Sequence, residues 1–339
     1  MRRIIGNRPK ETDFMDRRTA LSAIGAACAS GISPLVHAQA FPDRPVRIIV
    51  PFAAGSTPDV VARILAAKLT PKWGHQVVVD PKPGGNGLIA IAALKAAPST
   101  GHDLLLASSS HLAVNPHLLR NVTYSVERDF VPISFVFHTP FFVVTSAAGP
   151  LQSMKSVIAA AKASPGKLNV GVPYLGSPPH LAVAMLEKAT GTRMTIIPFK
   201  DGQQIYTAIA SGEVDLSLAT IGSTLPLVQA GKLKLIAIAA PTRLARQPDV
   251  PTVGEDGGPA GYDVNTWVGL VARSGAPQHA IQKISDDLAE VLRDPEVIQQ
   301  FTRVGIEPES SSPAGMRARM TSDTAKYAEV IKRLGVSLE

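Results

Sequence analysis

Short apolar runs alternate along this chain with segments whose apolar residues recur every three or four positions. The first run, residues 46–50, is an unbroken and mostly β-branched stretch between two prolines, which is typical of a buried strand. The segment 59–69 that follows has its apolar residues at helical spacing. Strands that alternate with helices predict a parallel sheet with helices on both faces.

The alternation continues to the C-terminus and predicts two α/β blocks within the 339 residues. Strands are expected at 46–50, 77–79, 104–107, 141–145, 168–171, 194–198, 214–218, 235–239 and 264–272. Helices are expected at 59–69, 86–97, 153–163, 178–189, 203–210, 276–292, 295–304 and 313–334. No repeat or flexible linker separates the blocks, so we expect two lobes that share strands, with crossings at 141–146 and 263–272.

The first forty residues differ from the rest of the chain. Arg17 and Arg18 precede a mild apolar stretch at 19–32, and the small-residue site Ala38-Gln39-Ala40 follows it. These are the parts of a secretory signal peptide, and the apolar stretch is shorter than the ~20 residues of a membrane span. We expect residues 1–40 to direct export to the periplasm. The twin-arginine and general secretory routes both remain open, as do translation starts at Met1 and at Met15.

The single cysteine, Cys28, lies inside this expected signal peptide. A lipoprotein anchor at Cys28 is the rival interpretation, but Gly25 stands where such a motif usually has leucine. The chain from Phe41 onward contains no cysteine, which suits an oxidising compartment.

Charge argues against nucleic acid as a partner. The first forty residues hold six of the 34 basic and three of the 27 acidic side chains, so 28 and 24 remain, a net charge of +4. No basic stripe interleaved with aromatic residues occurs, and aromatic residues make up only 5% of the chain. The mild positive excess is compatible with an anionic ligand and equally with an ordinary solvated surface.

The loop 51–59 joins a predicted strand directly to a predicted helix. Thr57 suits the N-cap, Pro58 the first helical position and Asp59 the first turn. Gly55 allows a tight turn or a close approach to a ligand. Free N–H groups and the helix dipole make such an end an anion site, although a simple helix cap explains the loop as well.

Three further loops occupy the same kind of joint, at 81–87, 174–180 and 198–203. In open α/β sheets, ligands bind at the carboxyl ends of the strands, where these loops lie. Two such loops in each block predict a single cleft in which backbone N–H groups of both lobes hold the carboxylates of a small acid.

Enzyme motifs are missing. The chain has no G-x-S-x-G nucleophile elbow and no H-E-x-x-H zinc motif. Ser108-Ser109-Ser110-His111 brings a nucleophile and a base together in sequence, but triads are assembled in space from distant residues. Surface or capping roles account for His111 and His117. The sequence therefore predicts no enzyme, no catalytic residue, no metal and no cofactor.

These loops together resemble the Bug family of extracytoplasmic solute receptors, the binding proteins of tripartite tricarboxylate transporters. The resemblance spans the chain from Phe41 onward. It rests on ordered matches such as Phe41-Pro-Asp-Arg-Pro-Val-Arg-Ile-Ile-Val-Pro-Phe-Ala-Ala-Gly, Pro83-Gly-Gly, Asn115-Pro116, Pro165-Gly-Lys-Leu, Gly176-Ser177, Val214-Asp215, Pro248-Asp-Val-Pro-Thr and Trp267-Val-Gly-Leu.

The resemblance implies a two-lobed α/β periplasmic binding protein fold of type II, a Venus flytrap with two hinge-crossing strands. Lobe 1 would comprise 41–142 and 268–339, and lobe 2 would comprise 143–267. It implies a receptor that captures a di- or tricarboxylate, an aromatic acid or an acidic amino acid. The residues expected at the ligand are Phe52, Gly55, Ser56, Thr57, Asp59, Ser108, Ser110, Asn115, Tyr174, Gly176, Ser177, Lys200 and Thr220.

Some positions depart from the family pattern. The usual glycine pair of the first loop is Gly55-Ser56, and Thr220 stands where an aspartate is common. Tyr174 and Phe199 favour an aromatic or bulkier acid. The expected partners are this acid and the membrane permease subunits, with no nucleic acid and no membrane insertion, and the expected state is a monomer. A ligand-presenting sensor for a signalling kinase and a periplasmic enzyme on the same scaffold are the alternatives.

Overall fold

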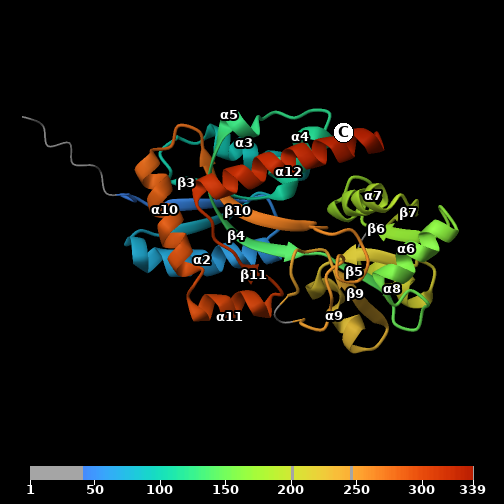
Figure 1. Ribbon diagram of the computed structural model, residues 1–339. Helices are drawn as coiled ribbons and strands as arrows, with labels where there is room; N and C mark the ends of the chain where they lie inside the picture. The colour runs from blue at the N-terminus through green and yellow to red at the C-terminus, as the bar shows by residue number, and fades with distance from the viewer. Residues whose placement is uncertain (1–40, 200–201, 245–246, 339) are drawn as a thin grey trace, which may run out of the picture. The chain divides into compact units, whose positions relative to one another are not determined.

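The computed structural model describes residues 41–199, 202–244 and 247–338 (Figure 1). The expected signal peptide, with Cys28, lies outside the described residues. The described strands form two sheets, and the first has the order β11-β4-β10-β3-β1-β2. Its strands are β1 (Val46–Val50), β2 (Val77–Pro81), β3 (Asp103–Ser108), β4 (Phe130–Pro140), β10 (Asn265–Arg273) and β11 (Glu307–Pro308).

The second sheet has the order β7-β6-β8-β5-β9. Its strands are β5 (Phe142–Ser146), β6 (Asn169–Val172), β7 (Thr195–Pro198), β8 (Leu216–Ala219) and β9 (Leu233–Ile238). Two sheets, each carrying helices, confirm the predicted two-lobed α/β fold.

The expectation of purely parallel strands is wrong at the strands that cross between the sheets. Strand β1 runs parallel to β2 and β3, but β10 is antiparallel to β3 and β4. Likewise β6 runs parallel to β7 and β8, while β5 is antiparallel to β8 and β9. Both β5 and β10 enter their sheet from the other lobe, so they run against their neighbours.

The chain changes sheet at two places. Strand β4 ends at Pro140 in the first sheet and β5 begins at Phe142 in the second. On the return, the Val264 N–H donates to the Ala239 carbonyl at 3.0 Å just before β10 begins. Both places lie at the predicted crossings. The exact lobe limits, 41–142 with 268–339 and 143–267, stay a prediction.

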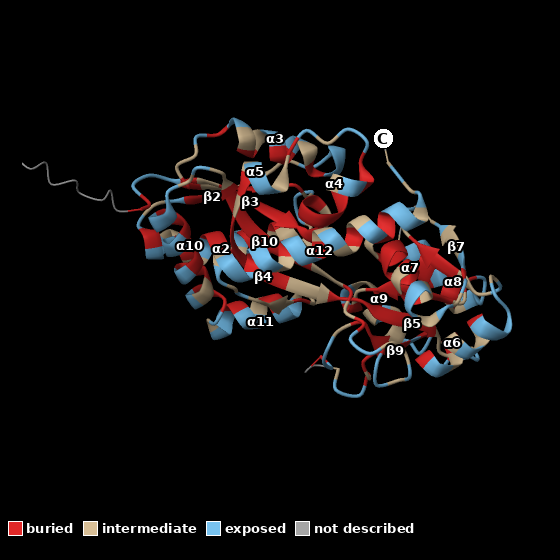
Figure 2. Ribbon diagram, turned by 45° about the horizontal axis from the view of Figure 1, so that its top comes forward, coloured by how far each residue is buried: buried red, intermediate tan, exposed pale blue. Residues whose placement is uncertain are grey.

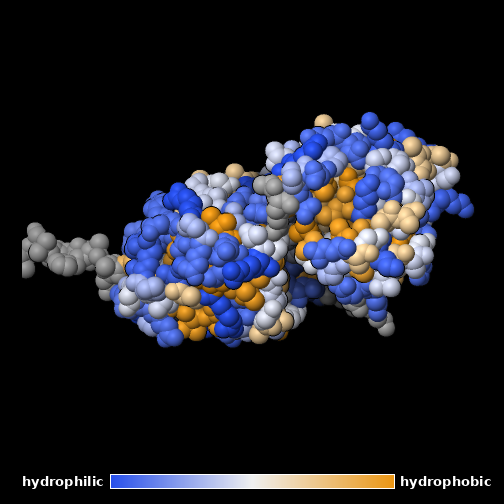
Figure 3. All heavy atoms as spheres, turned by 90° about the horizontal axis from the view of Figure 1, so that it is seen from below, coloured by the Kyte–Doolittle hydropathy of each residue, from blue (hydrophilic) through white to orange (hydrophobic). Residues whose placement is uncertain are grey.

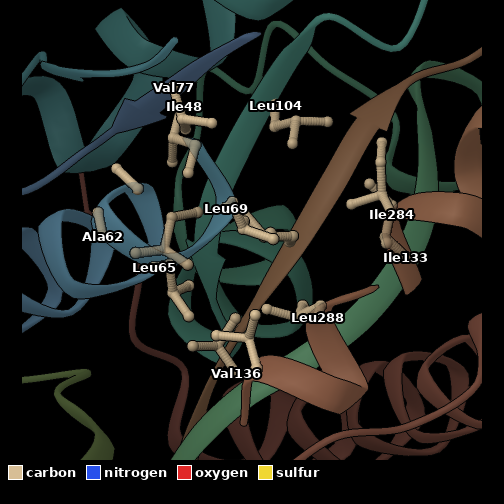
Figure 4. Packing of buried hydrophobic residues seen from close by; sticks show 14 of the residues in the cluster. Ile48, Ala62, Leu65, Leu69, Val77, Leu104, Ile133, Val136, Ile284 and Leu288 are labelled. Carbon is tan, nitrogen blue, oxygen red and sulfur yellow. The ribbon is translucent and has the colours of Figure 1, made fainter. Parts of the chain in front are cut away.

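The first sheet is covered by helices on both faces. Strand residues alternate between the faces. Ile48 belongs to one buried cluster with Leu65 of α2 (Thr57–Trp73) and Ile284 of α10 (Gln278–Val291), which Figure 4 shows. Its neighbour Ile49 packs on the opposite face with Ile91 of α3 (Leu88–Ala96). Helices α11 (Pro295–Arg303) and α12 (Pro313–Leu334) complete the two layers. The inner strands β1, β3, β4 and β10 are therefore buried along most of their length, as Figure 2 shows, whereas the edge strands β2 and β11 are only partly buried.

The second sheet is built in the same way. Val143 faces α6 (Met154–Ala163) and α7 (Pro178–Thr190) in one buried cluster. Val144 lies in the other, with α8 (Gly202–Ser211) and α9 (Ile221–Gln229). A further cluster joins the two lobes, because Leu118 of α4 (Asn115–Leu118), Leu181 of α7 and Tyr327 of α12 pack together. The remaining short helices are η1 (Gly85–Gly87), η2 (Ser110–Val114) and α5 (Val126–Asp129).

Of the described elements with nine or more residues, β4 and α9 were not expected from the sequence, and the short elements η2, α4, α5 and β11 were not expected either. Prolines interrupt the pattern of each of the two longer elements, Pro132 in β4 and Pro226 in α9. The sheet tolerates Pro132 because it lies at a shift in register against β10, where the regular ladder of hydrogen bonds is broken.

Most apolar side chains lie inside the molecule. The large apolar side chains that the described part of the chain exposes are Val78, Ile89, Tyr174, Leu175 and Ile298. The face in Figure 3 is mainly hydrophilic, with apolar residues gathered in separate patches. None of the helices in the described ranges is both long and apolar enough to cross a membrane.

Candidate functional site

A cavity of about 520 Å³ lies where segments of both lobes meet. This volume falls within the range of small-molecule sites. We call it the cleft, and the described residues that line it carry no charged side chain. The lining residues are Phe52, Thr57, Pro58, Ser108, Ser110, Phe137, Thr139, Thr220, Gly222, Ser223, Thr266, Val268, Val304, Gly305 and Ile306.

The loop between β1 and α2 is held together by Asp59. This side chain is 1% exposed, and its Oδ2 accepts a hydrogen bond from the Gly55 N–H at 2.9 Å. The Arg63 guanidinium pairs with the same carboxylate at 3.0 Å. Burial opposes ionisation of Asp59, but the hydrogen bonds from Arg63 and Gly55 outweigh it and lower its pKa. Asp59 is thus an internal brace of the loop.

The start of α2 is left uncapped inside the cleft. Ser56 takes the N-cap position, but its hydroxyl donates to the Ala53 carbonyl at 2.6 Å and accepts no bond from the helix. The first N–H groups of a helix have no partner within it. Pro58 has no N–H, so the Thr57 amide is the donor that this end offers to the cleft. The helix dipole adds partial positive charge there, which favours an anion.

The second lobe contributes the start of α9. Thr220 is its N-cap residue in extended conformation, and its side chain makes no capping bond. Thr220, Gly222 and Ser223 line the cleft opposite the first lobe. Gly222 meets Gly305 of the first lobe so closely that a Cβ on Gly305 would lie 3.4 Å from the Gly222 Cα. This contact bounds the cleft on one side.

Ser108, at the end of β3, is paired with His111. The Ser108 N–H donates to the His111 Nδ1 at 3.1 Å, and the Ser108 Oγ lies 3.0 Å from the same nitrogen. Burial lowers the pKa of His111 to about 4, so the ring is neutral at pH 7. Its other edge covers Gly87, where a Cβ would lie 2.5 Å from Nε2. The imidazole is therefore packed in place by its surroundings.

The loop between β6 and α7 offers no comparable donor. The Ser177 side chain is buried and caps α7 by accepting from the His180 N–H, and the first two helical positions are Pro178 and Pro179. The Gly176 N–H donates to the His180 Nδ1 at 2.8 Å. The N–H groups of Gly176, Ser177 and His180 are thus engaged within the turn, and prolines take the two positions between Ser177 and His180.

The predicted ligand residues divide into groups by position. Five line the cleft, namely Phe52, Thr57, Ser108, Ser110 and Thr220. Gly55, Ser56 and Asp59 lie in the same loop as Thr57 but do not line it. Asn115 donates to the Asn86 carbonyl, and Tyr174, Gly176 and Ser177 are also outside the lining. Lys200 lies outside the described residues. Ligand contact stays a prediction for all of them.

Other lining residues escaped the sequence analysis. Gly222 and Ser223 belong to α9, whose strand-to-helix joint at 219–221 has a threonine at the N-cap but lacks the glycine and proline that marked the other loops. Thr139 and Thr266 lie opposite each other on β4 and β10. The pairing of these distant segments decides which of their residues reach the cleft, and local patterns do not reveal it.

The donor set favours no metal. Among the described residues, no group of three or more His, Cys, Asp or Glu is placed to hold a metal ion. The cleft is lined by hydroxyl groups, backbone amides and apolar side chains, which suit an organic molecule with hydrogen-bonding oxygens.

Comparison with known proteins agrees with the predicted family. Protein BugT of Bordetella pertussis is 31% identical over 96% of this chain and all of its own length. The structure described as R. palustris Rpa4515 with adipate is 28% identical, with a TM-score of 0.72 over 88% of this chain and 99% of that one. MatC (Rpa3494) from Rhodopseudomonas palustris with bound malate is 25% identical, with a TM-score of 0.67 over 86% and 100%.

The sequence profile of one family matches residues 61–336, which cover most of the chain and every described strand except β1. Its members are receptors rather than enzymes by description. The chain belongs to the tripartite tricarboxylate transporter family of receptors.

Proposed function

We propose that this protein is a periplasmic receptor that captures a small organic carboxylate in the cleft for a tripartite tricarboxylate-type transporter. The observation that carries the proposal is the uncapped start of α2, where Thr57 and Pro58 line a cavity between the lobes. Two relatives whose structures are described with adipate and with malate support the same ligand class.

The described lining can hold an acid through hydrogen bonds and apolar contacts. Hydroxyl groups come from Ser110 and Thr220, and an apolar wall comes from Phe52 and Phe137. Backbone N–H groups and hydroxyl groups bind carboxylate oxygens by charge-assisted hydrogen bonds, while the wall covers the carbon chain. A lining of this kind fits short dicarboxylates better than sugars, which need more polar partners.

The fold supplies a hinge for capture. The lobes are joined by the crossings before Phe142 and before Asn265, and the cleft lies between them. Ligand binding would hold the lobes closed, and the closed form of a monomer would dock on the membrane permease subunits. Lobe limits at 142 and 267, export of the chain to the periplasm and the absence of enzyme activity are parts of this proposal.

Thermal unfolding of the purified protein with a panel of organic acids tests the proposal. A ligand that binds only the folded state adds about 2.7 kcal/mol at one hundred times its Kd, so Tm rises by several degrees. Di- or tricarboxylates should raise Tm, and the matching diamides and diols should not. Equal shifts with the neutral analogues, or no shift with any acid, would contradict the proposal.

A further inference from the structure

The pair formed by Ser108 and His111 fixes the position of one proton in the cleft. A backbone N–H can only donate, and the Ser108 N–H donates to the His111 Nδ1 at 3.1 Å. Nδ1 therefore carries a lone pair, and the ring proton of the neutral imidazole is on Nε2.

The same lone pair determines the direction of the Ser108 hydroxyl. Its Oγ lies 3.0 Å from Nδ1, a distance at which two opposed lone pairs repel each other. The hydroxyl therefore donates its single hydrogen to Nδ1, sharing that nitrogen with the backbone N–H. What remains on Oγ are two lone pairs, so Ser108 can only accept further hydrogen bonds.

His111 cannot easily turn away to release this hydroxyl. Its ring is 6% exposed, lies against Gly87, and meets the Phe52 ring edge-on with centroids 5.3 Å apart. The Tyr124 hydroxyl donates a hydrogen bond to the backbone carbonyl of the same histidine at 2.5 Å. A flipped ring would present carbon in place of Nδ1 and would lose both hydrogen bonds with Ser108.

The cleft thus has two kinds of polar wall. The Thr57 amide at the start of α2 donates, whereas the Ser108 oxygen accepts and would repel a carboxylate. We infer that Ser108 determines specificity by accepting a hydrogen bond from a hydroxyl group of the ligand, so that the receptor prefers hydroxy acids to unsubstituted acids of the same length. This inference rests on the proposed function, because it assumes that the cleft binds an acid.

Calorimetric titration at pH 7.5 with matched probes tests the inference. Succinate is compared with both enantiomers of malate and of methoxysuccinate, and adipate with 3-hydroxyadipate and 3-methoxyadipate. The better hydroxy enantiomer should bind at least about fivefold more tightly than the plain acid, as expected for one net hydrogen bond. The methoxy analogue should lose this gain, because its oxygen cannot donate.

Two variants locate the effect. Ser108→Ala should bring the hydroxy acid down to the affinity of the plain acid. Ser109→Ala, the neighbouring buried serine that does not line the cleft, should keep the full preference. Because calorimetry reports the fraction of active protein, partial misfolding of a variant does not alter the ratio of affinities.

Three results would overturn the inference. They are equal affinity for plain and hydroxy acids, a methoxy analogue as tight as the hydroxy acid, and a preference that survives in Ser108→Ala. In each case acids still bind, so the proposed function stands. If none of the probes binds while other carboxylates raise Tm, the preference for hydroxy acids falls alone. If no carboxylate binds, both proposals fall.

Discussion

The starts of α2 and α7 look alike in sequence but differ in how many backbone N–H groups they leave uncapped. Each follows a buried strand, and each has a glycine with positive φ, then serine at the N-cap and proline in the first turn. In each, the glycine N–H donates to the side chain four residues later, to Asp59 in the first loop and to His180 in the second. The two loops are therefore braced by the same geometry.

The difference lies in the remaining amides. At α7, two prolines replace the first donors and Ser177 caps the third, so the helix end is complete without a ligand. At α2, the Ser56 hydroxyl donates to the Ala53 carbonyl and caps no amide, and the first helical residue, Thr57, lines the cleft. The same signature closes a helix within the protein in one lobe and leaves an uncapped helix start beside the cleft in the other.

Replacing the glycine of each loop with alanine should give the largest difference between the loops, measured as lost free energy of unfolding. Gly176 has φ +86°, and an added Cβ would lie 2.7 Å from the Leu118 Cδ1, whereas Gly55 has φ +80° and open space around it. Gly176→Ala should lower the free energy of unfolding by about 3 kcal/mol through strain and overpacking. Gly55→Ala should cost about 1 kcal/mol. Urea denaturation measures both, and similar costs would show that the two loops are packed alike.

As the pH falls, the stability contributed by His111 and His180 should be lost before the stability contributed by Asp59. The pKa of His111 is lowered from 6.5 to about 4 in the folded protein. As the pH falls, this histidine is therefore protonated in the unfolded chain before it is protonated in the folded protein. Stability from this group is complete above pH 6.5 and is lost as pH falls toward 4, by about 2 kcal/mol between pH 7.5 and 5. Burial also lowers the pKa of His180, which adds to the loss in the same direction.

Asp59 behaves differently, because its lowered pKa keeps its contribution until the pH falls below about 4. Denaturation curves at pH 7.5 and 5 should therefore differ less for His111→Gln and for His180→Asn than for the unmodified protein. A pH dependence unchanged in both variants would refute the assignment of this loss to the two histidines.

The donor at α2 can be deleted with little change in backbone shape. Ser56 already has the extended conformation that a following proline requires, and proline suits the first helical position. Thr57→Pro should weaken carboxylate binding by about tenfold, because a charge-assisted hydrogen bond is lost. Thr57→Ala keeps the amide and serves as the matched control. Calorimetric affinities that fall equally in both variants would assign the effect to the side chain.

Replacing the N-cap serine of each helix with alanine should give the smallest difference in unfolding free energy between the two loops. Ser177→Ala removes a cap and should cost about 1 kcal/mol of unfolding free energy. Ser56 makes no capping bond, so Ser56→Ala should cost less than about 0.5 kcal/mol. Equal costs in thermal unfolding would mean that both serines, or neither, cap their helices.

Much of the fold could be predicted because the spacing of apolar residues within each segment indicates a helix or a strand. Strand β1 and helices α7 and α12 appear at or near their predicted bounds, since their apolar residues report burial directly. Strand β4 and helix α9 were missed because Pro132 and Pro226 interrupt their patterns. Whether a strand or helix tolerates such a proline depends on its register and packing with distant segments.

The site was only partly predictable for a related reason. Local signatures indicate which helix starts have caps, but not which amides are engaged. Gly176 resembles Gly55 until its contact with Leu118, from a segment far away in sequence, is known. Gly222 and Gly305 reach the cleft only because the two lobes bring them together. Such long-range contacts are set by the whole fold.

The central claim is that uncapped helix starts of both lobes, at α2 and α9, hold the acid group. Titration of ¹⁵N-labelled protein with adipate and with malate, followed by amide spectra, tests it most directly. The account predicts the largest saturable shifts at the amides of Thr57 and Gly222, with smaller ones at Gly176 and Ser177. Dominant shifts at Gly176 and Ser177, with Thr57 and Gly222 unmoved, would contradict it.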